Sequence, residues 1–156
     1  MKKLKVFIDG ACSHVLDKER AKGGWAYIIT DDNFNILKQD YGKLRTGRQN
    51  SQRSEMEAFY MALQAMKAFN NKTKFDVYCD YDALVDAVNG FSKRRCDRDI
   101  WDMIEPLCIS LAGQMKMHHI KGHEESVQNK LNEFNNKADG LAKAGINSLL
   151  KVPAEY

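Results

Sequence analysis

Apolar and polar positions alternate in three runs near the start of the chain, and this pattern predicts three strands. The first run covers residues 4–8 and ends at Asp9. The second run, 25–30, is separated from the third, 35–41, by turn-forming residues at 31–33. Because the connection between the second and third runs is short, we expect an antiparallel meander.

Helical spacing replaces this alternation from about residue 54 to residue 69, where Ser54 and Glu57 fit a capping box. An apolar run at 75–80 follows, and a short helix that closes near Gly90 comes after it. This order of strand, helix and strand implies parallel pairing through right-handed crossovers.

Two further helices and one strand are predicted in the second half. An apolar stripe covers residues 100–111 and contains Pro106, which we expect to kink or split that helix. A fifth strand is predicted at 115–120, followed by a last helix from about Asn136 to Leu150. The fold class is therefore α/β, with a five-stranded mixed sheet, an antiparallel meander plus two parallel strands, flanked by helices.

The length of 156 residues suits one domain, which we place at residues 1–152, with a frayed tail at 153–156. No stretch approaches the roughly 20 apolar residues that a bilayer-spanning helix needs. The N-terminus runs into a strand pattern instead of a signal-peptide core. The four cysteines form no CxxC pair and no zinc spacing. We therefore expect a cytoplasmic protein with reduced thiols and no membrane partner.

Four acids stand where a compact α/β fold can bring them together. Asp9 and Asp80 each end an apolar run, and Glu55 and Asp139 each open a helical stretch. Any one of these acids alone is better explained by a structural role, such as a turn or cap. Four together repel one another, and hard divalent cations between them remove that repulsion. The set predicts a Mg²⁺ site and phosphate chemistry.

The net charge of +3 says little, but basic residues gather in two segments. One contains Lys93, Arg94, Arg95 and Arg98, and the other contains Lys43, Arg45, Arg48 and Arg53. Such clusters are usually solvated surface. Beside an acidic metal site they favour a nucleic-acid backbone as partner.

The chain resembles ribonuclease H of type 1 in a series of motifs that follow the family's order. They are Phe7-Ile8-Asp9-Gly10-Ala11-Cys12, Gly23-Gly24-Trp25-Ala26-Tyr27, Gln52-Arg53-Ser54-Glu55-Met56-Glu57-Ala58, Tyr78-Cys79-Asp80-Tyr81-Asp82-Ala83-Leu84-Val85, Ile120-Lys121-Gly122-His123 and Asn135-Asn136-Lys137-Ala138-Asp139-Gly140-Leu141-Ala142. The resemblance implies an RNase H-like fold and endonucleolytic cleavage of the RNA strand of RNA–DNA hybrids, leaving 5′-phosphate and 3′-hydroxyl ends.

By position, the resemblance assigns the metal-binding catalytic carboxylates to Asp9, Glu55, Asp80 and Asp139. It implies two Mg²⁺ ions about 4 Å apart, with Mn²⁺ as an alternative ion. His123 takes the place of the family's mobile histidine, which assists proton transfer or product release.

Two neighbouring acids compete with this assignment. Glu57 lies two residues after Glu55, but the family's Arg-x-Glu spacing selects Glu55. Glu55 also stands one helical turn before the core-facing Phe59, so that Glu57 points elsewhere. Asp82 follows Asp80 by two positions and fits a helix N-cap or first-turn acid better.

Substrate contacts are predicted at two places. Arg48, Ser51 and Gln52 precede the Glu55 helix and suit phosphates or 2′-hydroxyls, with ordinary loop polarity as an equal alternative. The segment Lys93-Arg94-Arg95 would hold the hybrid backbone, although it is shorter than the basic handle of many bacterial members.

We therefore expect a monomeric, metal-dependent ribonuclease acting on RNA–DNA hybrids. One alternative is an RNase H-fold nuclease that cuts DNA, such as a junction resolvase or transposase core. Others are a hybrid-binding module that no longer cuts, and a domain that needs a partner for activity. The preference for Mg²⁺ over Mn²⁺ and the physiological hybrid are left open by the sequence.

Overall fold

The fold is known from a computed structural model, which describes residues 2–14, 17, 19–45, 47–90, 97–120 and 129–148. One five-stranded sheet has the strand order β3-β2-β1-β4-β5. Its strands are β1 (Lys3–Ser13), β2 (Lys22–Asp31), β3 (Ile36–Lys43), β4 (Lys74–Cys79) and β5 (Met115–His119). The helices are α1 (Ser51–Met66), α2 (Asp82–Val88), α3 (Arg98–Ser110) and α4 (Lys130–Gly145).

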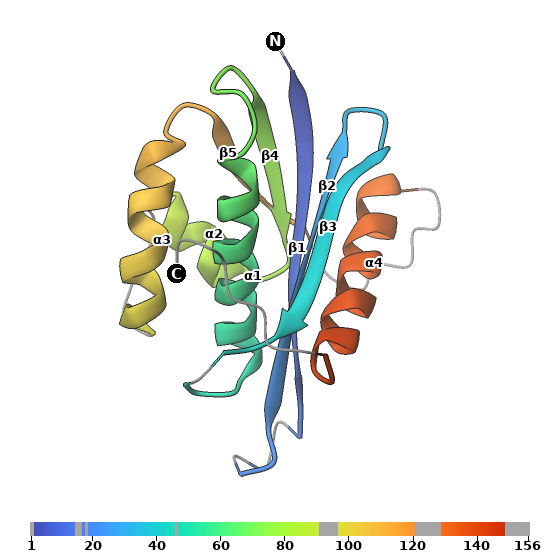
Figure 1. Ribbon diagram of the computed structural model, residues 1–156, viewed down its shortest axis with the longest axis vertical. Helices are drawn as coiled ribbons and strands as arrows, with labels where there is room; N and C mark the ends of the chain where they lie inside the picture. The colour runs from blue at the N-terminus through green and yellow to red at the C-terminus, as the bar shows by residue number, and fades with distance from the viewer. Residues whose placement is uncertain are drawn as a thin grey trace.

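The sheet is mixed, as the sequence predicted. β1 pairs antiparallel with β2, and β2 pairs antiparallel with β3, which is the expected meander. β4 pairs parallel with both β1 and β5. The central strand β1 is therefore shared between the two halves of the sheet (Figure 1).

Helices cover the sheet on both faces. On one face, Leu4, Val6 and Ile8 of β1 pack in a core with the apolar sides of α1 and α3. On the other face, Phe7 packs with Phe134 of α4. Because alternate residues of a strand point to opposite faces, β1 is buried on both sides, and its side chains are fixed in direction.

Helix α1 begins three residues earlier than predicted. The side chain of Asn50 caps it by accepting from the backbone N–H of Arg53 at 2.7 Å. Ser54 is already inside the helix, where its hydroxyl donates to the Asn50 carbonyl at 2.8 Å. The predicted capping box is therefore wrong, and Glu55 lies one turn inside α1 instead of opening it.

Helix α4 also begins earlier than predicted, at Lys130, because the Asn129 side chain accepts from the N–H of Leu131 at 3.0 Å. Asp139 consequently lies in the middle of α4 and does not open it. Near the end of α4, the backbone passes so close to Gly24 of β2 that a Cβ there would overlap the Ala142 carbonyl. This close approach holds α4 against the sheet.

Helix α3 is not split by Pro106, which lies inside the continuous helix Arg98–Ser110. Proline removes the hydrogen bond to the carbonyl four residues earlier, that of Asp102. Both residues are exposed, so water can satisfy that carbonyl. Among the described helices, none has the length and apolar character that crossing a membrane would require.

Candidate active site

Strand pairing brings the first two acids together. β1 and β4 pair in parallel with Phe7 opposite Tyr78. The same offset, continued two residues further, sets Asp9 beside Asp80 at the carboxyl ends of these pairings. Asp9 is 2% exposed, and its Oδ1 accepts from the Gly10 N–H at 3.0 Å.

Glu55 reaches the same point from α1. The helix crosses β1 at Gly10, where a Cβ would overlap the backbone of Ser54 and Glu55. Glu55 is only 6% exposed. One carboxylate oxygen each of Glu55 and Asp80 and the Cys79 sulfur lie within 4.8 Å of one another. A glycine at position 10 is therefore what allows the third acid to enter the site.

Asp139 approaches from α4 on the other side. Its Oδ2 lies 2.9 Å from Nζ of Lys143, one turn further along the helix, and its side chain is 24% exposed. Its charge acts on Asp9, so the fourth acid belongs to the same cluster. The structure thus brings together Asp9, Glu55, Asp80 and Asp139, although their metal-binding and catalytic roles are still predictions.

The electrostatics of the cluster are unfavourable without a cation. Burial raises the pKa of Asp9 to about 7, and the charges of Asp80 and Asp139 add to this, while hydrogen bonding with Glu55 acts in the opposite direction. Burial, Asp9 and Asp80 likewise hold the pKa of Glu55 well above its usual range. Because Asp9 and Glu55 both resist ionisation, their negative charges have too few positive groups nearby, in the part of the chain that the structure describes, to balance them.

The donor set fits a hard divalent cation. Oδ2 of Asp9 is buried and accepts from no amide, amine or hydroxyl group among the described residues. Carboxylate oxygens are the ligands that Mg²⁺ prefers. Cys79 is an unsuitable ligand because burial raises the pKa of its thiol well above the usual range, which keeps it protonated.

The competing acids take other roles. Glu57 is buried and forms an ion pair with Arg45, away from the cluster, as the helical spacing predicted. Asp82 lies in the first turn of α2 without capping it, because Tyr81 is the N-cap residue.

The second predicted basic group is only partly on the surface. Arg45 is buried against Glu57. Arg53 is buried as well, and its guanidinium contacts Asp97 at 2.9 Å and Asp99 at 2.6 Å. The interpretation of these two arginines as part of a phosphate-binding surface is therefore wrong, because both are held in ion pairs inside the protein.

The predicted substrate contacts are only partly within the described structure. Arg48 and Gln52 are exposed, and Ser51 is half-buried at the first position of α1, one turn before Glu55. His123 and the segment Lys93-Arg94-Arg95 lie outside the described residues. All seven assignments stay predictions.

Sequence reasoning missed two residues of the site. Lys143 neutralises Asp139, and the spacing of four residues on one helix was the signal for that pair. Cys79 lies with its sulfur 3.7 Å from Glu55 Oε2. Its position directly before Asp80, on the α1 face of β4, could have placed it near Glu55.

Comparisons with known proteins agree with this geometry. The RNase H family model matches residues 1–147. A protein named ribonuclease H from Chlorobium phaeobacteroides (strain BS1) is 30% identical over 159 residues, covering 93% of this chain and 96% of the relative. A ribonuclease H from Caldanaerobacter subterraneus subsp. tengcongensis is 26% identical, covering 95% of this chain and 94% of the relative.

Solved structures with low sequence identity share the fold. LC11-RNase H1, isolated from compost by a metagenomic approach, superposes with a TM-score of 0.74 at 21% identity, covering 94% of this chain and 97% of that one. Its complex with an RNA/DNA hybrid gives a TM-score of 0.72 at 19% identity, covering 92% and 96%. From the family match and the named relatives, together with the acid cluster at the end of β1 and β4, the chain belongs to the RNase H family and is a ribonuclease H enzyme.

Proposed function

We propose that this enzyme hydrolyses the RNA strand of RNA–DNA hybrids with two divalent cations, Mg²⁺ or alternatively Mn²⁺, leaving 5′-phosphate and 3′-hydroxyl ends. The observation that carries the proposal is the convergence of the half-buried Asp80 with the buried Asp9 and Glu55, whose own pKa values burial raises. The hybrid bound to LC11-RNase H1 supports the choice of substrate.

Each acid has a distinct part in holding the ions. Asp9, fixed by the Gly10 N–H, would contact both. Glu55 and Asp80 would complete the shell of one ion, and Asp139 that of the other, in competition with the Lys143 ammonium. When bound, the cations would activate the attacking water and neutralise charge on the scissile phosphate.

The remaining residues would select and orient the substrate. The 2′-hydroxyl distinguishes RNA from DNA, and Glu55 would contact a sugar hydroxyl beside the scissile phosphate. Arg48, Ser51 and Gln52 would meet phosphates or 2′-hydroxyls. His123 would move a proton or assist product release.

The basic segment Lys93-Arg94-Arg95 would hold the hybrid backbone by its charge. We also propose that the protein acts as a monomer in the cytoplasm, in one domain covering residues 1–152. The free thiols of Cys12, Cys79 and Cys108 support a reducing compartment.

Cleavage of end-labelled hybrid tests the proposal, with duplex DNA, duplex RNA and single strands in parallel. We expect Mg²⁺-dependent cleavage of the RNA strand of the hybrid alone, and loss of cleavage in Asp9→Asn. Asp102→Asn is the matched control, since it removes an exposed carboxylate of α3 far from the cluster in sequence. Full activity in excess EDTA, 2′,3′-cyclic phosphate ends, or equal cleavage of duplex DNA would overturn the proposal.

A further inference from the structure

The sheet face that carries α4 is only partly covered by the residues that the structure describes. α4 packs against β1, β2 and β3, and leaves side chains of β4 and β5 accessible on that face. Asp76 of β4 and His118 of β5 have side chains 25% and 39% exposed, and they bond to each other at 2.7 Å. This open strip therefore lies beside α4, along β4 and β5.

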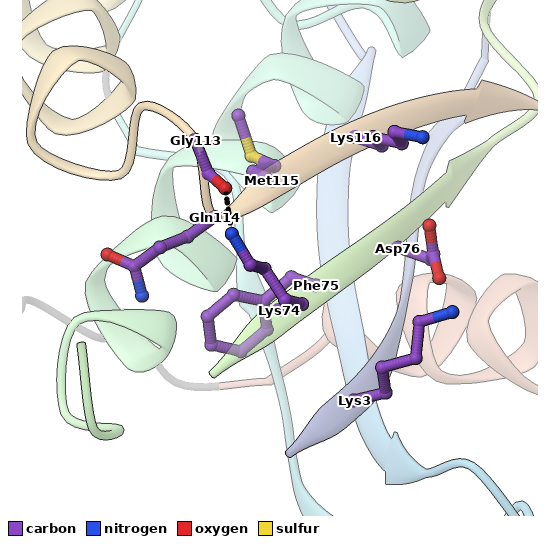
Figure 2. A pocket seen from close by; sticks show the side chains of 8 residues that line it. All are labelled: Lys3, Lys74, Phe75, Asp76, Gly113, Gln114, Met115 and Lys116. Atoms are coloured by element: carbon purple, nitrogen blue, oxygen red, sulfur yellow. Dashed lines mark hydrogen bonds between the residues drawn. The ribbon is translucent and has the colours of Figure 1, made fainter. Parts of the chain in front are cut away.

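A pocket of about 370 Å³ lies at one end of the strip (Figure 2). Three lysines from three parallel strands line it, Lys3 of β1, Lys74 of β4 and Lys116 of β5. Nζ of Lys74 donates to the Gly113 carbonyl at 2.5 Å, which fixes that ammonium at the pocket wall. Lys3 and Lys116 are exposed, and neither forms an ion pair that the described residues reveal.

The pocket is aligned with the acid cluster. Lys3 and Asp9 are both odd positions of β1. Lys74 opens β4, and Asp80 follows directly after its last residue at an even spacing from Lys74, so each pair points to the same sheet face. Six residues separate the members of each pair, which at about 3.3 Å per residue is about 20 Å. The lysines therefore mark the far end of a strip whose near end is the active site.

The charges of the pocket select a polyanion. Against its three lysines stands one carboxylate, Asp76, which already bonds His118. Strand-aligned ammonium groups that face solvent can each approach one phosphate and release its counterion. Neutral or cationic ligands gain nothing from this arrangement.

We propose that Lys3, Lys74 and Lys116 form a second anchoring site for the phosphate backbone of the hybrid, on the flank of the cleaved position. The inference rests on the proposed function, because the same duplex must occupy the acid cluster. At about 3.4 Å per nucleotide, 20 Å corresponds to about six base pairs. A hybrid that extends less than this from the scissile bond cannot reach both places.

Cleavage kinetics with hybrids of two lengths test the site in Mg²⁺. One hybrid has about 24 base pairs and the other about 8, each with a single cleavable bond at its centre. About four base pairs, or about 14 Å, flank that bond in the short hybrid, so only the long hybrid covers the distance of about 20 Å. The test variant is Lys3→Ala/Lys116→Ala. The control variant is Lys38→Ala/Lys67→Ala, which removes two exposed lysines from β3 and from the end of α1. Thermal unfolding checks that both variants keep the fold.

For the long hybrid we expect the test variant to raise KM by on the order of ten- to a hundredfold at about 0.1 M salt, with kcat unchanged. The salt slope of kcat/KM should fall by about 2, because two phosphate contacts are lost. Short-hybrid kinetics and the control variant should match the wild type. Equal kinetics of the two variants on the long hybrid would overturn the anchoring site while leaving the proposed function intact. A wild-type chain that cleaves neither hybrid would overturn both.

Discussion

Replacing Asp9 by asparagine should stabilise the metal-free protein while abolishing hydrolysis. The pKa of Asp9 is raised from 3.8 to about 7, chiefly by burial. The folded protein therefore binds this proton more tightly than the unfolded chain does. The resulting stability is complete below about pH 4 and is lost as the pH rises to about 7. At about 1.4 kcal/mol per pKa unit, the ionised carboxylate costs up to about 4 kcal/mol at pH 8.

Asparagine removes this cost with little change in shape. Its carbonyl oxygen can still accept from the Gly10 N–H, and its amide group takes the place of the buried Oδ2, next to carboxylates that accept hydrogen bonds. Urea unfolding followed by circular dichroism in EDTA measures the effect. Relative to wild type, we expect no gain near pH 4 and a gain of up to about 4 kcal/mol at pH 8, or up to about 10 °C in Tm.

Adding Mg²⁺ should stabilise the wild type and not the variant. Mg²⁺ binds the folded wild type in preference to the unfolded chain, so it should raise the stability of wild type at pH 8 and have little effect on the variant. Asp102→Asn controls for the loss of one charge and should change neither measurement. If Asp9→Asn is no more stable than wild type at pH 8 in EDTA, the cluster is not strained by uncompensated charge, and the reasoning fails.

Three further predictions concern packing and proton transfer. Gly10→Ala should destabilise the fold and lower kcat together, since its methyl group overlaps the backbone at Glu55; urea unfolding and hybrid cleavage measure both. Glu57→Ala should cost roughly 3–5 kcal/mol of unfolding free energy, because it removes the carboxylate that forms an ion pair with the buried Arg45, while kcat is retained in the folded fraction. An unchanged urea midpoint of unfolding would contradict this. His123→Ala should slow cleavage by about 10²–10⁴-fold at most, less than Asp9→Asn does, and equal loss in both would show that the histidine holds a metal.

Local patterns were sufficient to predict most of the fold. Alternation in β1 and helical spacing in α1 are properties of adjacent residues, so the elements and the mixed sheet could be inferred. The first residue of α1 could not be predicted, because Asn50 and Ser54 are both residue types that cap helices well. The hydrogen bond from the Arg53 N–H to Asn50 decides between them, and it is visible only in the structure.

Long-range partners explain the errors at the site. Arg53 and Asp97 are 44 residues apart in sequence, and their ion pair forms only when α1 packs near the start of α3. The prediction from charge clustering along the chain therefore put Arg53 on the surface, which is wrong. The four acids were found because each stands in a recognisable family motif, whereas the Asp139–Lys143 pair shows only in helical spacing.

The pairing of Asp9 with Asp80 has a consequence for how the length of this chain can change. Because side chains alternate between faces, one residue inserted between Lys3 and Asp9, or between Lys74 and Asp80, would turn the acid toward α1. An insertion at the turn between β2 and β3 does not change which sheet face Asp9 and Asp80 point to. Gains and losses of residues should therefore accumulate in the turns, while the two short intervals leading to the aspartates keep a fixed number of residues.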